Sequence, residues 1–221
     1  QNDEHIAIWS DYDADGIPGA VVLHDFFKRI GHLNFENYIP DRHGEGFGLN
    51  AKAVEELAKA GARLLITIDC GITDVAEVAR ANELGIDVII TDHHIPLSKG
   101  GGESASRGLS NNPPAEDGSA PFTNTPPASE CSAPLARGDG DFLPSAYAIL
   151  NPKQPDCAYP EKMLCGSGVV FKLIQALCFE IRNSKFGIPA TIFPVGQEKW
   201  LLDMVGLATL SDMVPLTGEN R

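Results

Sequence analysis

The sequence predicts an α/β protein: a doubly wound, mainly parallel sheet with helices on both faces, followed by a helical C-terminal part. Apolar runs of strand length alternate with amphipathic runs of helix length over residues 5–91, a pattern typical of such a sheet. After residue 145, one more strand-like run gives way to two apolar runs of helix length. A chain of 221 residues, 43% of them hydrophobic, can bury one good core.

Each element is predicted from its local pattern. The run 63–68 is almost entirely apolar, as a strand is when both faces of its sheet are covered. Asn50 is suited to cap the start of a helix, and Gly31 and Gly61 are suited to end helices. Strands are expected at 5–9, 34–39, 63–68, 87–91 and 145–150, and helices at 18–30, 51–60, 73–84, 165–182 and 199–210.

Residues 97–143 differ in composition from the rest of the chain. Runs such as Gly100-Gly101-Gly102 and Pro113-Pro114 lie among Ser, Ala and Asn, and no apolar periodicity is present. A structureless loop of this length is uncommon inside a compact domain. We therefore expect a flexible Gly/Ser/Pro-rich surface insertion that takes no part in catalysis.

Composition limits the classes of function. With 17 Lys and Arg against 30 Asp and Glu, a net charge of −13, the chain has no bulk attraction for nucleic acid, so a nucleic-acid enzyme of this kind would rely on metal ions and a few local cations. Five cysteines without a C-x-x-C pair indicate a reducing compartment and argue against zinc. No apolar run reaches membrane-spanning length and no signal peptide precedes Gln1, so we expect a cytoplasmic protein without a membrane partner.

Acidic residues follow three of the predicted strands. Asp11, Asp13 and Asp15 come after the first strand, Asp69 after the third, and Asp92-His93-His94 after the fourth. Like charges this close repel each other unless a cation lies among them, and carboxylate oxygens suit Mg²⁺ or Mn²⁺. The first group alone is equally compatible with a solvated acidic turn. Because the carboxyl ends of parallel strands meet at one edge, where such folds bind ligands, the three groups together favour a metal site.

Two later segments allow more than one interpretation. Asp212 follows an apolar helix and precedes Pro215, so it is either a helix-terminal residue or a further metal ligand. Gly166-Ser167-Gly168 opens the helix at 165–182, where the small residues permit close backbone approach and the helix N-terminus could bind a phosphate. We interpret these glycines as packing devices.

These segments resemble, in order, the four motifs of the DHH phosphoesterase family: Asp-Tyr-Asp-Ala-Asp-Gly at 11–16, Ile-Asp-Cys-Gly-Ile at 68–72, Thr-Asp-His-His at 91–94 and the segment 211–221. The flanking segments 40–49 and Asn-Pro-Lys at 151–153 are similar to the RecJ branch, the 5′→3′ exonucleases specific for single-stranded DNA. The resemblance covers nearly the whole chain apart from the insertion. It implies that 1–221 is one DHH catalytic domain.

The resemblance also implies a centre of two metal ions. The positions that match the ligands are Asp13, Asp15, Asp69, His93 and Asp212, with Asp69 bridging the ions. A ligand set that combines imidazole with carboxylates favours Mn²⁺, with Mg²⁺ as the alternative. Two such ions can ionise a bridging water, neutralise phosphate oxygens and stabilise the leaving alkoxide.

Further roles follow from the same resemblance. Asp69, His93 and His94 match the catalytic positions, and His94 would face the phosphate as a donor or leaving-group acid. Asp92 would orient the ligating His from outside the coordination sphere, and Asp11 is either such an outer carboxylate or a further ligand. The residues expected to bind substrate are Arg42, which suits a phosphate, Phe47, which offers a ring for stacking, and His94.

The chain departs from the family pattern at three places. Phe47 stands where relatives have Tyr, so it keeps the ring for stacking but lacks the hydroxyl. Trp9 stands where some members carry a His, so one ion would be held by carboxylates and water alone. Members of the RecJ branch also continue into a linking helix and a DHH-associated domain. The segments that resemble this chain end before those two parts. The chain therefore resembles a DHH catalytic domain without that C-terminal domain.

The resemblance implies a Mn²⁺-dependent 5′→3′ exonuclease that acts on single-stranded DNA in repair and recombination. Two alternatives stay open: a nano-RNase or cyclic-dinucleotide phosphodiesterase that acts on short oligonucleotides, and an inactive structural subunit of a replication or repair complex. Inactive relatives lose metal ligands, whereas this chain keeps every matched ligand apart from the Trp9 position. A repair or replication protein as partner is compatible with these alternatives.

Overall fold

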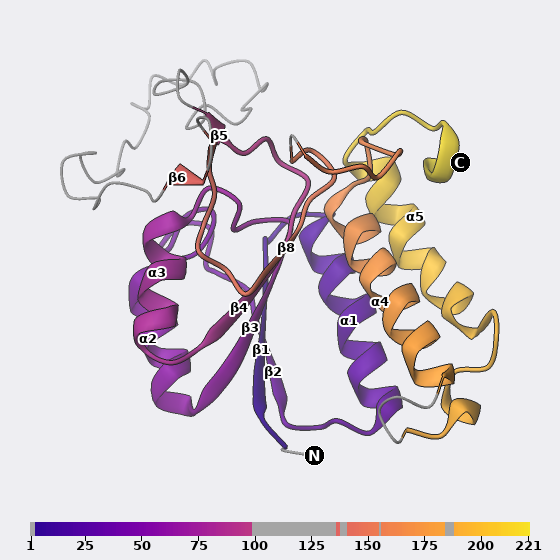
Figure 1. Ribbon diagram of the computed structural model, residues 1–221, viewed down its shortest axis with the longest axis horizontal. Helices are drawn as coiled ribbons and strands as arrows, with labels where there is room; N and C mark the ends of the chain where they lie inside the picture. The colour runs from indigo at the N-terminus through magenta and orange to yellow at the C-terminus, as the bar shows by residue number, and fades with distance from the viewer. Residues whose placement is uncertain (1–2, 99–135, 138–140, 155, 184–187) are drawn as a thin grey trace.

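The computed structural model describes residues 3–98, 136–137, 141–154, 156–183 and 188–221, and it has the three-layer architecture of a sheet between helices (Figure 1). The central sheet has five parallel strands in the order β2-β1-β3-β4-β8. The strands are β1 (His5–Ser10), β2 (Phe35–Tyr38), β3 (Ala62–Ile68), β4 (Asp87–Thr91) and β8 (Ala148–Leu150). The predicted parallel sheet is confirmed. The last strand is shorter than the predicted 145–150, since only its final three residues pair with β4.

Helices cover both faces of the sheet, as predicted (Figure 1). One layer holds α2 (Ala51–Ala60) and α3 (Val75–Glu83), and the other holds α1 (Gly16–Ile30), α4 (Gly166–Arg182) and α5 (Leu202–Ser211). Successive strand residues point to opposite faces. Accordingly Ile8 and Ile66 belong to the apolar core against α1 and α4, whereas Ala7 and Leu65 belong to the core against α2 and α3.

Local signals set the helix ends much as predicted. The Asn50 side chain accepts a hydrogen bond from Ala53 N at 2.8 Å, and Gly31 and Gly61 end their helices with φ of +79° and +96°. The helix predicted at 199–210 begins instead as a 3₁₀ turn, η2 (Gln197–Leu201), and becomes α-helical only at α5. Two further 3₁₀ turns are η1 (Ala190–Ile192) and η3 (Gly218–Asn220).

The two ends of the predicted insertion pair with each other. Strands β5 (Leu97–Ser98), β6 (Ala136–Arg137) and β7 (Asp141–Phe142) form a small antiparallel sheet in the order β5-β7-β6. Residues 99–135 and 138–140 lie outside the described part of the chain, so the flexibility expected of the insertion stays a prediction. Among the described residues, no helix combines the length and the apolar character that crossing a membrane requires.

Candidate metal centre

The acidic groups meet at the carboxyl edge of the sheet, because the backbone ladder continues one residue past each strand. Asp11 N donates to Ile68 O at 3.1 Å, Asp69 N to Thr91 O at 2.9 Å and Asp92 N to Leu150 O at 3.0 Å. These bonds hold the turns after β1, β3 and β4 beside one another. The strand order reverses direction between β1 and β3, the point at which doubly wound folds bind their ligands.

The His93 ring lies close to three carboxylates that come from three other parts of the fold. Its Nε2 lies 3.1 Å from Asp69 Oδ1 and 3.7 Å from Asp15 Oδ2, and its Nδ1 lies 3.7 Å from Asp212 Oδ2. Ligand-type atoms within 4.8 Å of one another form three groups: Asp69–His93–His94, Asp15–His93–Asp212 and Asp11–Asp13–Asp69. The structure thus brings together every residue that the sequence predicted as a metal ligand.

Asp69 has the most demanding environment of the cluster. Its side chain is 3% exposed, and its φ of +61° lies in the left-handed region that few residues other than Gly, Asn and Asp adopt. Burial raises the pKa of Asp69 well above its ordinary value, and the carboxylates of Asp15 and Asp13 raise it further. A cation bound here would relieve both the burial cost and the repulsion.

Three buried polar atoms of the cluster that form no hydrogen bond in the described part of the chain also favour a bound cation. Asp69 Oδ1, Asp11 Oδ1 and His93 Nδ1 are buried and accept or donate no hydrogen bond within the described residues. Burial, together with the neighbouring His94, lowers the pKa of His93, so this imidazole is held neutral, the form that binds a metal ion. Carboxylate oxygens combined with a neutral imidazole fit ions such as Mn²⁺.

The N-terminus of α4 binds the side chain of Asp15, although the two lie 151 positions apart in the sequence. Asp15 Oδ2 accepts a hydrogen bond from Gly166 N at 2.5 Å, and Oδ1 accepts one from Ser167 N at 2.8 Å. Ser167 Oγ also donates to the Asp15 carbonyl at 2.5 Å. The sequence indicated that this helix N-terminus could bind a phosphate, but we interpreted its glycines as packing devices. The structure shows that an anion is bound, and that it is the Asp15 carboxylate.

Close approach at this point requires glycine. A Cβ atom at Gly166 would lie 2.7 Å from Asp69 Cβ and 2.8 Å from Asp69 Oδ1. One at Gly19 would lie 2.7 Å from Ile68 Cγ2 and 3.1 Å from Ser167 Oγ. The packing role predicted for the glycines that open α4 is therefore present at Gly166, where it acts directly on the centre.

The remaining carboxylates of the cluster are less deeply buried or differently paired. Asp13 is exposed, and its Oδ1 accepts hydrogen bonds from Asp15 N at 2.8 Å and Gly16 N at 2.9 Å, which starts α1. Burial raises the pKa of Asp11 to about 6. Burial, followed by Asp15 and Asp13, likewise raises the pKa of Asp212 to about 6. Whether Asp11 is a ligand or an outer carboxylate stays open.

Asp92 organises the turn after β4. Its Oδ1 accepts hydrogen bonds from His93 N at 2.7 Å, His94 N at 3.0 Å and His94 Nδ1 at 2.7 Å, and its Oδ2 accepts one from Ile72 N at 3.0 Å. Although burial opposes it, these bonds hold the pKa of Asp92 below its ordinary value. We expected Asp92 to orient the ligating His93; the structure shows its side chain bonded to the His94 ring and, on the His93 side, only to the backbone N–H of His93.

The residues predicted to bind substrate lie at the exposed rim of the centre. The Arg42 guanidinium stacks 5.2 Å from the ring of Tyr12, the residue between Asp11 and Asp13. The Phe47 ring, 53% exposed as a residue, meets the His94 ring edge-on at 5.8 Å. The structure thus places Arg42 and Phe47 at the rim, each beside a turn that carries carboxylates or imidazoles of the centre.

Residues 40–49, which carry Arg42 and Phe47, form the rim loop. The sequence did not indicate which residues shape this loop. Glu45 accepts hydrogen bonds from Tyr38 Oη, from Asp41 N at 2.7 Å and from Asn50 Nδ2 at 3.1 Å. Asp74 Oδ2 accepts one from Leu49 N at 2.7 Å and so ties the loop to the start of α3. Nothing in the sequence near Leu49 indicates Asp74 as its distant partner.

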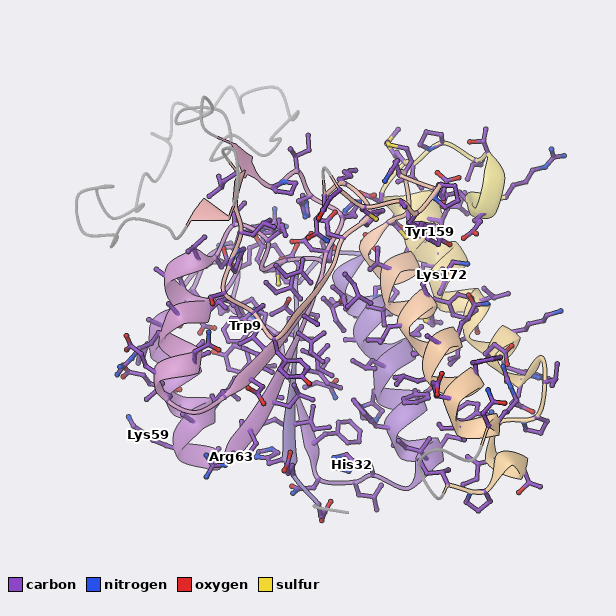
Figure 2. The ribbon with its side chains drawn as sticks, in the orientation of Figure 1. Trp9, His32, Lys59, Arg63, Tyr159 and Lys172 are labelled. Carbon is purple, nitrogen blue, oxygen red and sulfur yellow. The ribbon has the colours of Figure 1, made fainter. Side chains whose placement is uncertain are left out.

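Trp9 occupies a structural position. It is fully buried, belongs to the core against α2 and α3, and stacks on Tyr38 with ring centroids 4.3 Å apart (Figure 2). It supplies no ligand to the centre. Whether one ion is consequently held by carboxylates and water alone stays a prediction.

Together, the fold and the site define an α/β domain with a cluster of carboxylates and imidazoles at its topological switch point. The sequence model of the DHH family, N-terminal domain, matches residues 5–117, slightly more than half of the chain. The chain therefore belongs to the DHH family.

Proteins named single-stranded-DNA-specific exonuclease RecJ are similar over almost the entire chain. The Bacillus subtilis protein is 36% identical over 219 residues, which are 99% of this chain and 20% of that protein. The Escherichia coli protein is 32% identical over 216 residues, 98% of this chain and 30% of that protein. The chain thus spans between about a fifth and a third of the length of these curated relatives.

Two solved structures, both of proteins with bound manganese, share the fold of this chain. A crystal structure of exonuclease RecJ bound to manganese superposes with a TM-score of 0.65 at 26% identity, covering 99% of this chain and 41% of that one. RecJ from Thermus thermophilus in complex with Mn²⁺ gives a TM-score of 0.61 at 26% identity, covering 99% of this chain and 23% of that one.

Proposed function

We propose that this chain is the catalytic domain of a Mn²⁺-dependent phosphodiesterase that removes nucleotides from the 5′ end of single-stranded DNA, in repair and recombination. One observation carries this proposal most directly. Asp69 is buried, its Oδ1 accepts no hydrogen bond within the described residues, and it is shared by two groups of ligand-type atoms. A carboxylate in that position is suited to bridge two cations. The RecJ relatives, which are named single-stranded-DNA-specific exonucleases, support the choice of substrate, and the 5′ polarity rests on the resemblance to the RecJ branch.

The chain's own residues would divide the work between binding and proton transfer. Ions held by Asp13, Asp15, Asp69, His93 and Asp212 would supply Lewis acidity and an ionised water to the reaction. At the rim, Arg42 can grip a phosphate with two parallel hydrogen bonds, and Phe47 can stack on a base.

His94 is suited to donate a hydrogen bond or proton to the phosphodiester. Its Nδ1 bonds the Asp92 carboxylate at 2.7 Å, which places a proton on Nδ1 and leaves Nε2 as the nitrogen that can face substrate. Although burial opposes it, the hydrogen bond to Asp92 raises the pKa of His94, so a larger fraction of this ring carries a second proton near neutral pH. That proton is the one available to a leaving oxygen.

The test is cleavage of single-stranded DNA labelled at either end, with Mn²⁺, by the wild type and by Asp69→Asn. Asn is chosen because it tolerates the left-handed backbone of residue 69 and keeps the shape of the side chain while removing its charge. We expect the wild type to release mononucleotides from the 5′ end, and the variant to lose at least about a hundredfold in kcat/KM.

The matched control is Asp25→Asn, which removes an exposed carboxylate on α1, outside the groups of ligand-type atoms. Calorimetry should show Mn²⁺ binding by the wild type and this control, and weakened binding by Asp69→Asn. A wild type that binds no Mn²⁺ and cleaves neither DNA nor RNA would contradict the proposal and favour the inactive subunit. Cleavage restricted to dinucleotides or cyclic dinucleotides would favour the nano-RNase alternative.

A further inference from the structure

The turn Asn151-Pro152-Lys153 forms part of the wall of the metal centre. It follows β8, whose last residue accepts the hydrogen bond from Asp92 N at 3.0 Å. Asn151 is 3% exposed; its Nδ2 donates to the His94 carbonyl at 2.8 Å, and its Oδ1 accepts from Lys153 N at 2.8 Å. One buried amide therefore connects the turn that carries His94 to the backbone of Lys153. The position of Lys153 relative to the centre is built into the fold.

The turn that carries Lys153 lies at the opposite end of the sheet edge from the loop that carries Arg42. Arg42 follows β2 and Lys153 follows β8, which are the two outer strands of the order β2-β1-β3-β4-β8. The carboxylates that follow β1, β3 and β4 lie between them. Two cations thus flank the carboxylates, one on each side of the rim.

Lys153 differs from the two lysines nearest to it in sequence. Lys162 Nζ donates to the carbonyls of Pro152 at 2.9 Å and Cys157 at 2.5 Å, and Lys172 Nζ lies 2.6 Å from Glu219 Oε2. Lys172 and Tyr159, which shares this glutamate, lie close together near the C-terminus (Figure 2). Lys153 forms no ion pair with any residue in the described ranges, although the chain carries an excess of carboxylates. An unpaired ammonium beside a phosphodiesterase centre is available for an anion.

We propose that Lys153 binds a phosphate of the single-stranded substrate other than the one being cleaved, with Asn151 as its positioning residue. This inference rests on the proposed function. A strand whose scissile phosphate lies over Asp69 carries further phosphates to either side, and Arg42 and Lys153 stand on the two sides. The arrangement selects an oligonucleotide over a substrate with a single phosphate, because only the former reaches Lys153 while it is being cleaved.

The experiment compares Lys153→Ala, Lys153→Arg and a matched control, Lys59→Ala, whose lysine lies at the far end of the molecule, by the C-terminus of α2 (Figure 2). Two substrates are used with Mn²⁺: a short oligothymidylate, and bis(p-nitrophenyl) phosphate, which has one phosphate. Binding of a fluorescent oligothymidylate in Ca²⁺ is measured by anisotropy between about 50 and about 200 mM salt.

We expect Lys153→Ala to raise the KM for the oligonucleotide about tenfold while leaving kcat/KM for bis(p-nitrophenyl) phosphate unchanged. The slope of log K against log salt should become shallower by about 0.7, the value for one phosphate contact on a single strand. Lys153→Arg should keep the slope of the wild type, and Lys59→Ala should match the wild type throughout. A residue with a merely structural role would not change the salt slope in this selective way.

Two results would overturn the inference while leaving the proposed function intact: an unchanged KM and salt slope in Lys153→Ala, or an equal loss on both substrates, which would place Lys153 at the scissile phosphate. A wild type that cleaves neither substrate would instead overturn the proposed function, and this inference with it. Melting temperatures of all variants show whether an effect arises from unfolding.

Discussion

The candidate metal centre has a buried floor and an exposed rim, and the two are held in place differently. The floor consists of Asp15, Asp69, Asp92 and His93, none of which is more than 7% exposed. The rim consists of Arg42, Phe47 and His94. Distant contacts fix the floor: the N-terminus of α4 binds the Asp15 carboxylate, and Ile72 N binds that of Asp92.

The rim loop relies mainly on residues near to it in sequence. Glu45 bonds Tyr38, Asp41 and Asn50, none of them more than 7 residues away. Asp74 provides the distant tie. The difference indicates that the positions of the floor residues depend on the whole fold. Residues of the rim loop can therefore be substituted without displacing the floor residues. Metal binding and substrate selection should therefore respond to different mutations.

We expect the largest effect from one methyl group added next to the Asp69 side chain. Gly166→Ala places a Cβ 2.7 Å from Asp69 Cβ, closer than real side chains approach, so either α4 or Asp69 must move. We expect about 3 kcal/mol of lost unfolding free energy and a loss of more than about a hundredfold in kcat/KM. Urea denaturation and Mn²⁺ titration measure the two effects.

The same helix provides the control for this change. At Gly168 an added Cβ would meet nothing closer than 3.5 Å, an ordinary contact distance, so Gly168→Ala should be close to neutral. Equal effects of the two substitutions would show that α4 is sensitive to any alanine in its first turn. In that case the contact between Gly166 and Asp69 would not be the reason for the loss.

A rim substitution should change binding without changing stability. Phe47→Leu removes an exposed ring that meets the His94 ring edge-on. We expect KM for single-stranded DNA to rise about tenfold through lost base stacking, with kcat within about twofold of the wild type. The melting temperature should stay the same. A lowered melting temperature together with lowered Mn²⁺ affinity would mean that the rim and the floor are not separable.

The smallest effect concerns Asp74, which connects the two regions. Burial raises the pKa of Asp74 to about 7, although the hydrogen bond from Leu49 N opposes the rise. An unfolded Asp titrates near about 3.9, so the folded state holds a proton that the unfolded state has lost. The stability from this group is therefore complete below about pH 4 and is lost as pH rises through about 7.

The loss should amount to about 1.4 kcal/mol between about pH 6 and about pH 8. Asp74→Asn stays neutral and can still accept the hydrogen bond from Leu49 N, so it should remove this part of the pH dependence. Urea denaturation at several pH values measures the difference, with Asp25→Asn as the exposed control. Parallel curves for the wild type and Asp74→Asn would show that Asp74 is ionised in the folded protein throughout.

The sequence predicted the floor well where its residues follow strands. Strand length, burial on both faces and the alternation with helices are local signals, and they place Asp11, Asp69 and Asp92 at one edge without any tertiary information. The caps at Asn50, Gly31 and Gly61 are local too, and the structure confirms them. Prediction succeeded where the cause lies within a few residues of the effect.

The features that the sequence did not predict depend on contacts between distant segments. Nothing near Asp15 indicates that Ser167 will bind it, and nothing near Leu49 indicates Asp74. The pairing of Asp92 with the His94 ring rather than the His93 ring depends on which ring nitrogen the turn after β4 brings within hydrogen-bond distance. The strand predicted at 145–150 was too long because pairing with β4, and not local propensity, decides where β8 begins.

The hydrogen bonds from α4 to Asp15 also set the order in which this domain can mature. They join residues 151 and 152 positions apart, so the chain must close a very long loop before Asp15 is held. A chain growing from its N-terminus contains Asp11 through His94 long before α4 is made. During that time its carboxylates repel one another with no helix N-terminus to oppose them. We therefore expect the proposed centre to bind metal tightly only after the last layer of the domain has docked.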